Sequence, residues 1–343
     1  MKTKGRENMV KFAVISIVLA GLILFDLTVG TNRISLGNIF DYFFFPRQLT
    51  SSTVFTIKEF RLARVITAVV AGAALAVSGL LMQTIFRNPL AGPYVLGISN
   101  GAGLGVAVVV LGGSIWGFSH SIETSNWMIL AASGLGAAAV LMLILAVSMR
   151  VKDVLSILII GILISGVVAS IVSIMQFFSN DVNVKSYVVW TMGSLDAVSF
   201  TESVLLIPIC MSVALVLYMF SKPLNLMLLG ESFATTMGVN IKLIRVVVFT
   251  GVSILTGAVT AFCGPLGFLG LAVPHISRWI FNTSNHFILI PASVILGAVF
   301  LLCGDILSHT MYAGGVLPIN AIISVLGAPF IIWIVFKNQR TII

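Results

Sequence analysis

The sequence predicts an all-α polytopic membrane protein with about ten transmembrane helices. Hydrophobic residues make up 59% of the chain and charged residues only 9%, and the mean hydropathy is +1.13. A soluble domain of 343 residues has no interior large enough to hide that apolar share. The apolar residues also gather in long runs, and about 20 helical residues cross a ~30 Å hydrocarbon core.

Nine runs reach the full crossing length, and a tenth is shorter. The nine cover residues 12–30, 62–82, 94–112, 127–149, 154–178, 203–220, 243–262, 287–308 and 318–336, and the short one covers 271–281. We interpret the first run as an uncleaved span and not a signal peptide, because it is long and no A-x-A-like cleavage site follows it.

The basic residues indicate the orientation. With ten spans and a cytoplasmic N-terminus, both termini are cytoplasmic, and 13 Lys and Arg residues lie inside against six outside. This agrees with the positive-inside rule. The six outer residues are Arg33, Arg47, Lys58, Arg61, Arg64 and Lys185. The net charge of +8 therefore requires no nucleic acid as a partner.

The chain divides near residue 200 into two halves of five spans each. In each half a Gly/Pro-rich interruption follows the second span, at residues 88–93 and 264–274. An odd number of spans per half makes the halves inverted in the membrane. Paired interruptions of this kind indicate a transport pathway at the interface of the repeats, because lipid does not tolerate unpaired backbone groups.

A set of motifs recurs through nearly the whole chain. In order these are Arg61-x-x-Arg64, Gly72, Ser78-Gly79, Gln83, Arg87 to Ala91, Leu96-Gly97, Gly101-Ala102, Leu229 to Glu231 with Ala234 and Gly238, Gly267 to Leu271, Pro274 to Arg278, Asp305, Leu317-Pro318 and Gly327 to Pro329. The pattern resembles the FecCD permeases, which are the membrane subunits of ABC importers for iron-siderophores, haem and vitamin B12.

The resemblance implies a single permease domain over residues 1–343 in the cytoplasmic (inner) membrane. It implies two ATP-binding subunits, an extracytoplasmic substrate-binding protein and a second permease copy as partners, with an iron-siderophore as the first candidate cargo and haem or cobalamin as alternatives. The loop 221–240 would dock into the ATPase through Gly230, Glu231, Ala234 and Gly238. We expect this loop to form two short helices, with Glu231 capping the second.

Arg61 and Arg64 would receive the binding protein, as the resemblance implies. At i and i+3 they share one helical face, and we expect them at a wet rim, at the outer N-terminal end of their span. The alternative is an anchor in the lipid headgroups, because arginine side chains reach readily to the interface.

The resemblance implies that the fifth span lines the translocation path, where Gly161, Ser165 and Ser170 are small or weakly polar, and we expect Asn88 and Pro89 at the first interruption to belong to the same path. The alternative for the serines is that they bond back to carbonyl groups of their own helix. We favour structural roles for Asp305, a charge late in its span, and for His275, which has no metal-ligand partner at a suitable spacing.

Four residues depart from the FecCD pattern: Ala63 replaces a proline, Val316 a glutamate and Asn320 a glycine, and His309 stands where an arginine is common. We expect the last three to lie near the outer mouth.

No catalytic, cofactor or metal site is expected. No Lys follows a Gly, so the phosphate-binding loop of an ATPase is absent from this sequence. Two rival functions are an ion-coupled secondary transporter, for which only Asp305 offers a candidate carboxylate, and a structural scaffold, which would not need paired helix breaks.

Overall fold

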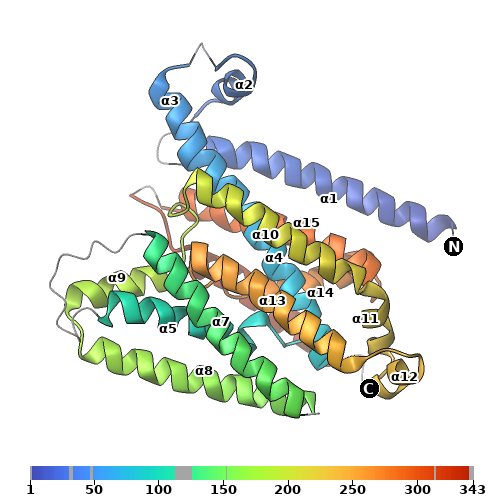
Figure 1. Cartoon of the computed structure of the whole chain (residues 1–343). Helices are drawn as coiled ribbons and strands as arrows, with labels where there is room; N and C mark the ends of the chain where they lie inside the picture. Colours follow the sequence, from blue (N-terminus) through green and yellow to red (C-terminus); the bar gives the residue numbers. More distant parts are fainter. Residues whose placement is uncertain are drawn as a thin grey trace.

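The computed structural model describes residues 2–30, 34–46, 49–112, 126–151, 153–312 and 314–339, and this part of the chain is helical without any strand (Figure 1). The prediction of an all-α protein is confirmed.

The first half contains α1 (Lys2–Thr28), α2 (Leu36–Phe44), α3 (Ser51–Phe55), the π-helical segment η2 (Thr56–Leu62), α4 (Ala63–Phe86), the 3₁₀ turn η3 (Pro93–Leu96), α5 (Ile98–Val110), α7 (Asn126–Arg150) and α8 (Val154–Phe177). The second half contains α9 (Asp181–Thr191), α10 (Phe200–Met219), α11 (Ser221–Leu228), α12 (Glu231–Thr236), α13 (Ile241–Cys263), α14 (Leu269–Phe281), α15 (His286–Thr310) and α16 (Ile319–Gln339).

Seven helices among the described residues are long and apolar enough to cross a membrane, and α5 and α16 supply shorter apolar segments, at Ile98–Val110 and Ile319–Pro329. The prediction of a full-length span at 94–112 was wrong, because α5 has only 13 residues. Gly92-Pro93 starts a 3₁₀ turn there, and Gly97 at φ 75° separates this turn from α5. The count of ten spans and the location of the termini stay predictions.

The segment before the second span is more ordered than the sequence indicated. Thr50 caps a helix at Ser51, and α3, η2 and α4 continue one another from Ser51 to Phe86. Arg61 and Arg64 therefore lie more than two turns inside a continuous helix. The expectation that they sit at its N-terminal end was wrong.

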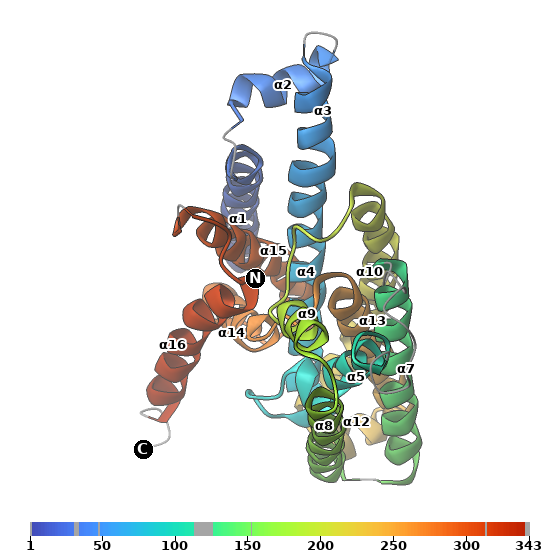
Figure 2. The same cartoon turned by 90° about the vertical axis from the view of Figure 1, so that its left-hand side faces the viewer.

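α4 is the central helix of the molecule. In the window that could span a membrane, 78% of its residues are buried, against 17–28% for α1, α7, α8 and α10. Figure 2 shows α4 between a group formed by α1, α14 and α15 and a group formed by α5, α7, α10 and α13. Glycines permit close contacts: a Cβ atom on Gly79 would lie 1.8 Å from the Gly270 carbonyl oxygen.

The packing is reciprocal between the two halves. α4, the second span of the first half, packs on α14 and α15 of the second half, and α13, the second span of the second half, packs on α5 and α7 of the first. The third span is short in both halves: α5 in the first half and α14 in the second have 13 residues each, and each follows the Gly/Pro-rich interruption of its own half. This arrangement agrees with the predicted internal repeat.

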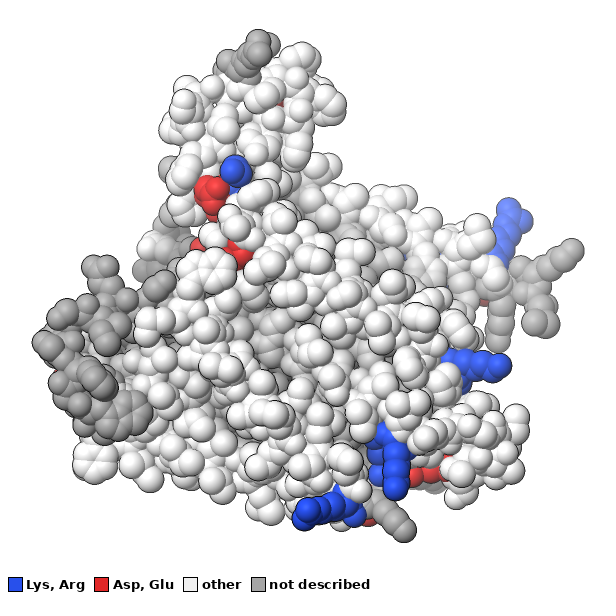
Figure 3. Space-filling view, viewed as in Figure 1, with Lys and Arg blue, Asp and Glu red and all other residues white. Residues whose placement is uncertain are grey.

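Charged side chains on the face in Figure 3 gather at two ends, whereas the body between them presents other residue types. One end carries α2 and α3, and the prediction from the basic residues is that this end lies outside. The other carries α11 and α12. Large apolar side chains on α1, α7, α8 and α10 are exposed between these ends, as expected for a surface that meets lipid or another membrane-embedded subunit.

Candidate functional site

The loop 221–240 forms the two expected short helices, α11 and α12. The turn between them depends on Gly230, whose φ of 122° is unfavourable for other residues. Gly238 has a φ of 83° at the end of α12, and Ala234 is fully buried. The loop is therefore a compact pair of helices with defined backbone geometry.

Glu231 does not cap α12, contrary to our expectation. Its carboxylate instead accepts hydrogen bonds from Arg245 Nη2 at 2.8 and 3.0 Å. Arg245 lies on α13 and its side chain is 8% exposed, whereas that of Glu231 is 35% exposed. The ion pair attaches the short helix to a long span.

The first interruption lies beside the same helices. Arg87 adopts a left-handed conformation at the end of α4 and donates from Nη2 to the Met227 carbonyl on α11 at 2.9 Å. Asn88 Oδ1 accepts from the backbone N–H of Leu90. His275 Nε2 lies 2.9 Å from the Pro89 carbonyl oxygen, which gives His275 the hydrogen-bonded structural role that we favoured.

A cluster of charged residues, the outer charge cluster, lies where α1, α4 and α15 meet the loop before α10. Its members are Asp26, Arg61, Arg64, Asp196, Asp305 and His309.

Arg64 is the centre of the outer charge cluster. Its Nη2 lies 3.1 Å from Asp26 Oδ1, and its Nε lies 2.9 Å from Asp305 Oδ2. The side chains of all three residues are at most 2% exposed. Arg64 also donates to the carbonyl groups of Asp26 and Val29, each at 2.8 Å. Asp305 therefore has the structural role that we favoured.

Arg61 is 5% exposed and donates to the Val29 carbonyl at the end of α1. Neither arginine lies at a wet rim, so that premise was wrong. The reason is that Asp26 and Asp305, distant in sequence, come together on α1 and α15 and enclose the guanidinium group of Arg64.

His309 and Asp196 complete the cluster. His309 Nε2 lies 3.1 Å from Asp196 Oδ2, and the Asp196 side chain is 38% exposed. Burial alone would raise the pKa of Asp196, but the hydrogen bond and charge of His309, together with Arg64 and Arg61, outweigh it and lower the pKa below its ordinary value. Asp196 is thus the accessible member of the pair.

The other three departures from the FecCD pattern differ in role, and Ala63 is simply buried within helix α4. Asn320 Oδ1 accepts from the backbone N–H of Gly267 at 2.9 Å and so fixes the second interruption. Val316 is 47% exposed and has no comparable role.

The serines of α8 bond back to their own helix. Ser165 donates to Gly161 and Ser170 to Gly166, each at 2.9 Å, so the alternative that we considered for these residues describes their geometry. Gly161 is buried, whereas Ser170 is exposed on the surface of α8. Asn100 Nδ2 donates to the Ser165 carbonyl at 3.3 Å, which connects α5 to α8.

A cavity of about 270 Å³ lies between α5, α8 and α9, and Pro265 of the second interruption adds to its wall. The polar residues that line it are Ser99, Asn100, Ser173, Tyr187, Trp190 and Thr191. No charged residue lines the cavity among the described residues. Such a wall offers few fixed ligands for a cargo.

Apolar spans, two helix interruptions and a pair of short helices attached to a span are the parts of a membrane permease. The chain belongs to the FecCD transport family, whose model matches residues 17–337.

The vitamin B12 import system permease proteins BtuC of Shigella boydii serotype 18 and Escherichia coli O9:H4 are each 31% identical to the chain over 340 residues. These matches cover 99% of this chain and 98% of theirs.

Solved structures agree on the fold. An inward-facing metal-chelate type ABC transporter is similar with a TM-score of 0.82 and 27% identity, covering 94% of this chain and 97% of that one. PsaBC from Streptococcus pneumoniae, solved with a Fab, shares the fold at a TM-score of 0.52 and 15% identity, covering 86% and 94% of the two chains.

The chain is therefore the permease subunit of an ABC importer, a multi-pass protein of the cytoplasmic membrane that works with ATP-binding subunits and a binding protein. It is a transport component and not an enzyme.

Proposed function

We propose that the chain imports a metal chelate, and the observation that carries this proposal is the cavity beside α8. Its walls offer hydroxyl, amide and aromatic groups but no charged residue among those described. This suits a cargo that the binding protein has already selected, and a bulky chelate would also need the space that a second permease copy on the α8 face would enclose. Iron-siderophore is the expected cargo of the family, and cobalamin is the second candidate because the most similar relatives named above import vitamin B12.

A binding titration of the cognate soluble binding protein distinguishes these cargoes. Ferric siderophores and cyanocobalamin should be offered separately, and one class should bind at micromolar concentration or below. Binding of neither class would contradict metal-chelate import.

We infer that two permease copies assemble with two ATP-binding subunits, and that both termini are cytoplasmic. The support for a second copy is the surface of α8, where Ser170 and Ser173 are exposed next to large apolar side chains. A second copy on this face would enclose the serines and the cavity between two subunits. The support for cytoplasmic termini is the excess of Lys and Arg residues on the side assigned to the cytoplasm.

Cysteine cross-linking tests this arrangement. After replacement of the three native cysteines, Ser173→Cys should cross-link two copies through a short bis-maleimide. Leu143→Cys, which lies on the exposed surface of α7, is the matched control and should not cross-link. Equal cross-linking of both variants would contradict an interface at α8.

We propose that Gly230, Glu231, Ala234 and Gly238 couple the permease to its ATPase. The support is the rigid geometry of α11 and α12 and their two attachments, Glu231 to Arg245 and Met227 to Arg87. The attachment of α11 to Arg87 also brings Asn88 and Pro89 of the tentative path next to the coupling helices.

We also propose that Arg61 and Arg64 receive the binding protein, with one condition added. Because both guanidinium groups are buried, an acidic residue of the partner must displace an internal acceptor, and the exposed Asp196 is the first that it would meet. Arg61→Gln should lower the ratio of stimulated to basal ATPase activity. Lys58→Gln, which changes an exposed outer cation, is the control, and equal ratios in the two variants would refute docking at Arg61.

A further inference from the structure

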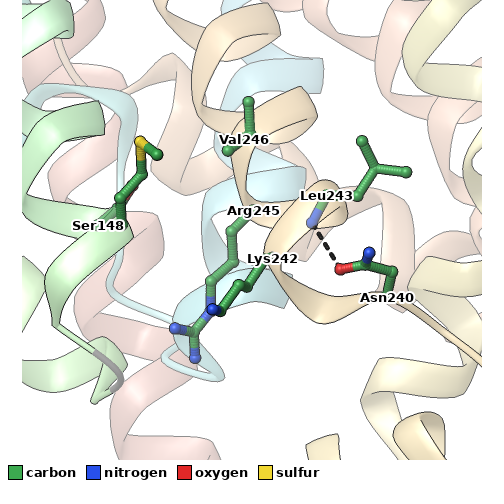
Figure 4. Close-up of a pocket in the computed structure, with 7 residues that line it drawn as sticks. Ser148, Asn240, Lys242, Leu243, Arg245 and Val246 are labelled. Carbon is green, nitrogen blue, oxygen red and sulfur yellow. Dashed lines mark hydrogen bonds between the residues drawn. The ribbon is translucent and has the colours of Figure 1, made fainter.

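A second cavity, of about 340 Å³, opens between the last turn of α7 and the first turns of α13. Seven residues line it: Ser148, Met149, Asn240, Lys242, Leu243, Arg245 and Val246. Figure 4 shows the nitrogen-bearing ends of Lys242 and Arg245 turned to the same side of α13, toward the helix that carries Ser148. None of the functions above uses this cavity.

The cavity is suited to an anion. Lys242 is exposed and Arg245 is buried, so a flexible cation and a fixed one meet at its wall. Both lie in the first two turns of the 23-residue helix α13, whose N-terminus adds the positive end of a helix dipole. Asn240 caps this helix by accepting from the Leu243 N–H at 3.1 Å.

Two carboxylates approach these cations without lining the cavity. Glu231 pairs with Arg245 on one side at 2.8 Å. Asp153 caps α8 and accepts hydrogen bonds from Ser156 N–H and Oγ at 2.9 and 2.7 Å. These bonds lower the pKa of Asp153, and the charge of Arg245 adds weakly to the lowering. Both carboxylates have partners of their own, and none of the described residues that line the wall beside Lys242 is acidic.

The remaining wall is apolar and faces outward. Met149 is 73% exposed, Leu243 52% and Val246 37%. α7 and α13 are both long enough to span a membrane, so their ends meet at the boundary between hydrocarbon and water. A ligand at this place would meet cations at one end and exposed apolar side chains at the other.

We propose that the cavity binds the phosphate headgroup of an anionic phospholipid, from the leaflet on the side of α11 and α12, with its acyl chains along Met149 and Val246. Basic pockets between spans on the cytoplasmic side are typical sites for such headgroups. A free phosphate would use the cations but leave the apolar wall uncovered, so the lipid fits both parts.

The lipid would share Arg245 with Glu231. A phosphate next to this guanidinium group competes for the charge that holds α12 to α13, and the two events are therefore energetically linked. This consequence rests on the proposed coupling role of α12, but binding itself does not. A binding measurement on the permease alone therefore tests the site independently of transport.

The test is a titration of the purified full-length chain in an uncharged detergent with dioctanoyl phosphatidylglycerol, followed by native mass spectrometry. Dioctanoyl phosphatidylcholine and inorganic phosphate are the comparison ligands. Lys242→Gln should weaken binding of the phosphatidylglycerol about fivefold, the value for one basic residue at a membrane surface. Lys242→Arg should retain the affinity, because it keeps the charge.

Lys222→Gln is the matched control, since it removes an exposed lysine from α11 outside the cavity, and its affinity should stay within about twofold of the unmodified chain. Equal affinities of the Lys242→Gln and Lys222→Gln variants would overturn the proposal. Binding of inorganic phosphate or phosphatidylcholine as tight as that of phosphatidylglycerol would also overturn it.

Discussion

Replacement of Arg64 by methionine tests the role of the outer charge cluster. The change keeps a long side chain but removes the cation between Asp26 and Asp305. We expect the variant to be less stable by about 3–5 kcal/mol, the usual cost of removing one partner from a buried ion pair.

The structure explains why the cost should be large. The side chains of Asp26 and Asp305 are 0% and 2% exposed, so water cannot replace the lost guanidinium group. The carbonyl groups of Asp26 and Val29 would also lose their Arg64 donors. Removing one carboxylate as well should restore part of the stability, so Arg64→Met with Asp305→Asn should be more stable than Arg64→Met alone.

The assay is unfolding of the purified chain in detergent or nanodiscs, followed by tryptophan fluorescence. Lys58→Met is the control, because Lys58 is 48% exposed and pairs with Glu59 only at 3.7 Å. It should cost at most about 1 kcal/mol. The reasoning is refuted if Arg64→Met costs no more than this control, or if the double variant is less stable than the single one.

Three further predictions concern packing, pH and coupling. Gly79→Ala should cost roughly 1–3 kcal/mol because its Cβ would overlap the Gly270 carbonyl, whereas Gly134→Ala, with nothing within 4 Å, should be neutral or stabilising; equal thermal midpoints would contradict this. The pKa of Asp196 is lower in the folded chain than in the unfolded chain, where it is about 3.9. The stabilisation that the Asp196 carboxylate contributes is therefore present above the unfolded value and is lost as the pH falls through the folded value. Asp196→Asn should make the thermal midpoint less dependent on pH below about pH 4. Glu231→Ala and Gly230→Val should leave the protein inserted in the membrane but impair transport and ATPase stimulation. Because Glu231 pairs with Arg245, the double exchange Glu231→Arg with Arg245→Glu should restore part of the stimulation. Normal uptake in both single variants would argue against coupling through α12.

The sequence predicted the features that depend on local chemistry. Gly230 and Gly238 mark the ends of α12 because their backbones need positive φ. The Pro and Gly residues at 88–93 and 264–274 mark the two interruptions because they interfere with a continuous helix. Apolar length predicted most spans directly.

The errors came from contacts between distant segments. Nothing around Arg64 indicates that Asp26 and Asp305 will enclose it, since 38 and 241 residues separate them from it in the chain. The pairing of Glu231 with Arg245 was missed for a different reason: the two residues are only 14 apart, but their contact depends on how α12 folds back against α13, which the sequence does not indicate. The helix before Arg61 was missed because the segment is mixed in polarity, and Thr50 and Ser51 were the available signal for its start.

ATP-driven uptake into proteoliposomes tests the central claim most directly. The vesicles should contain the permease with its ATP-binding subunits, enclosed ATP and external binding protein loaded with its metal chelate, and a protonophore should remove any ion gradient. We expect uptake that continues with the protonophore, stops without ATP and is impaired in Glu231→Ala. Uptake that needs the gradient and proceeds without ATP would contradict the central claim.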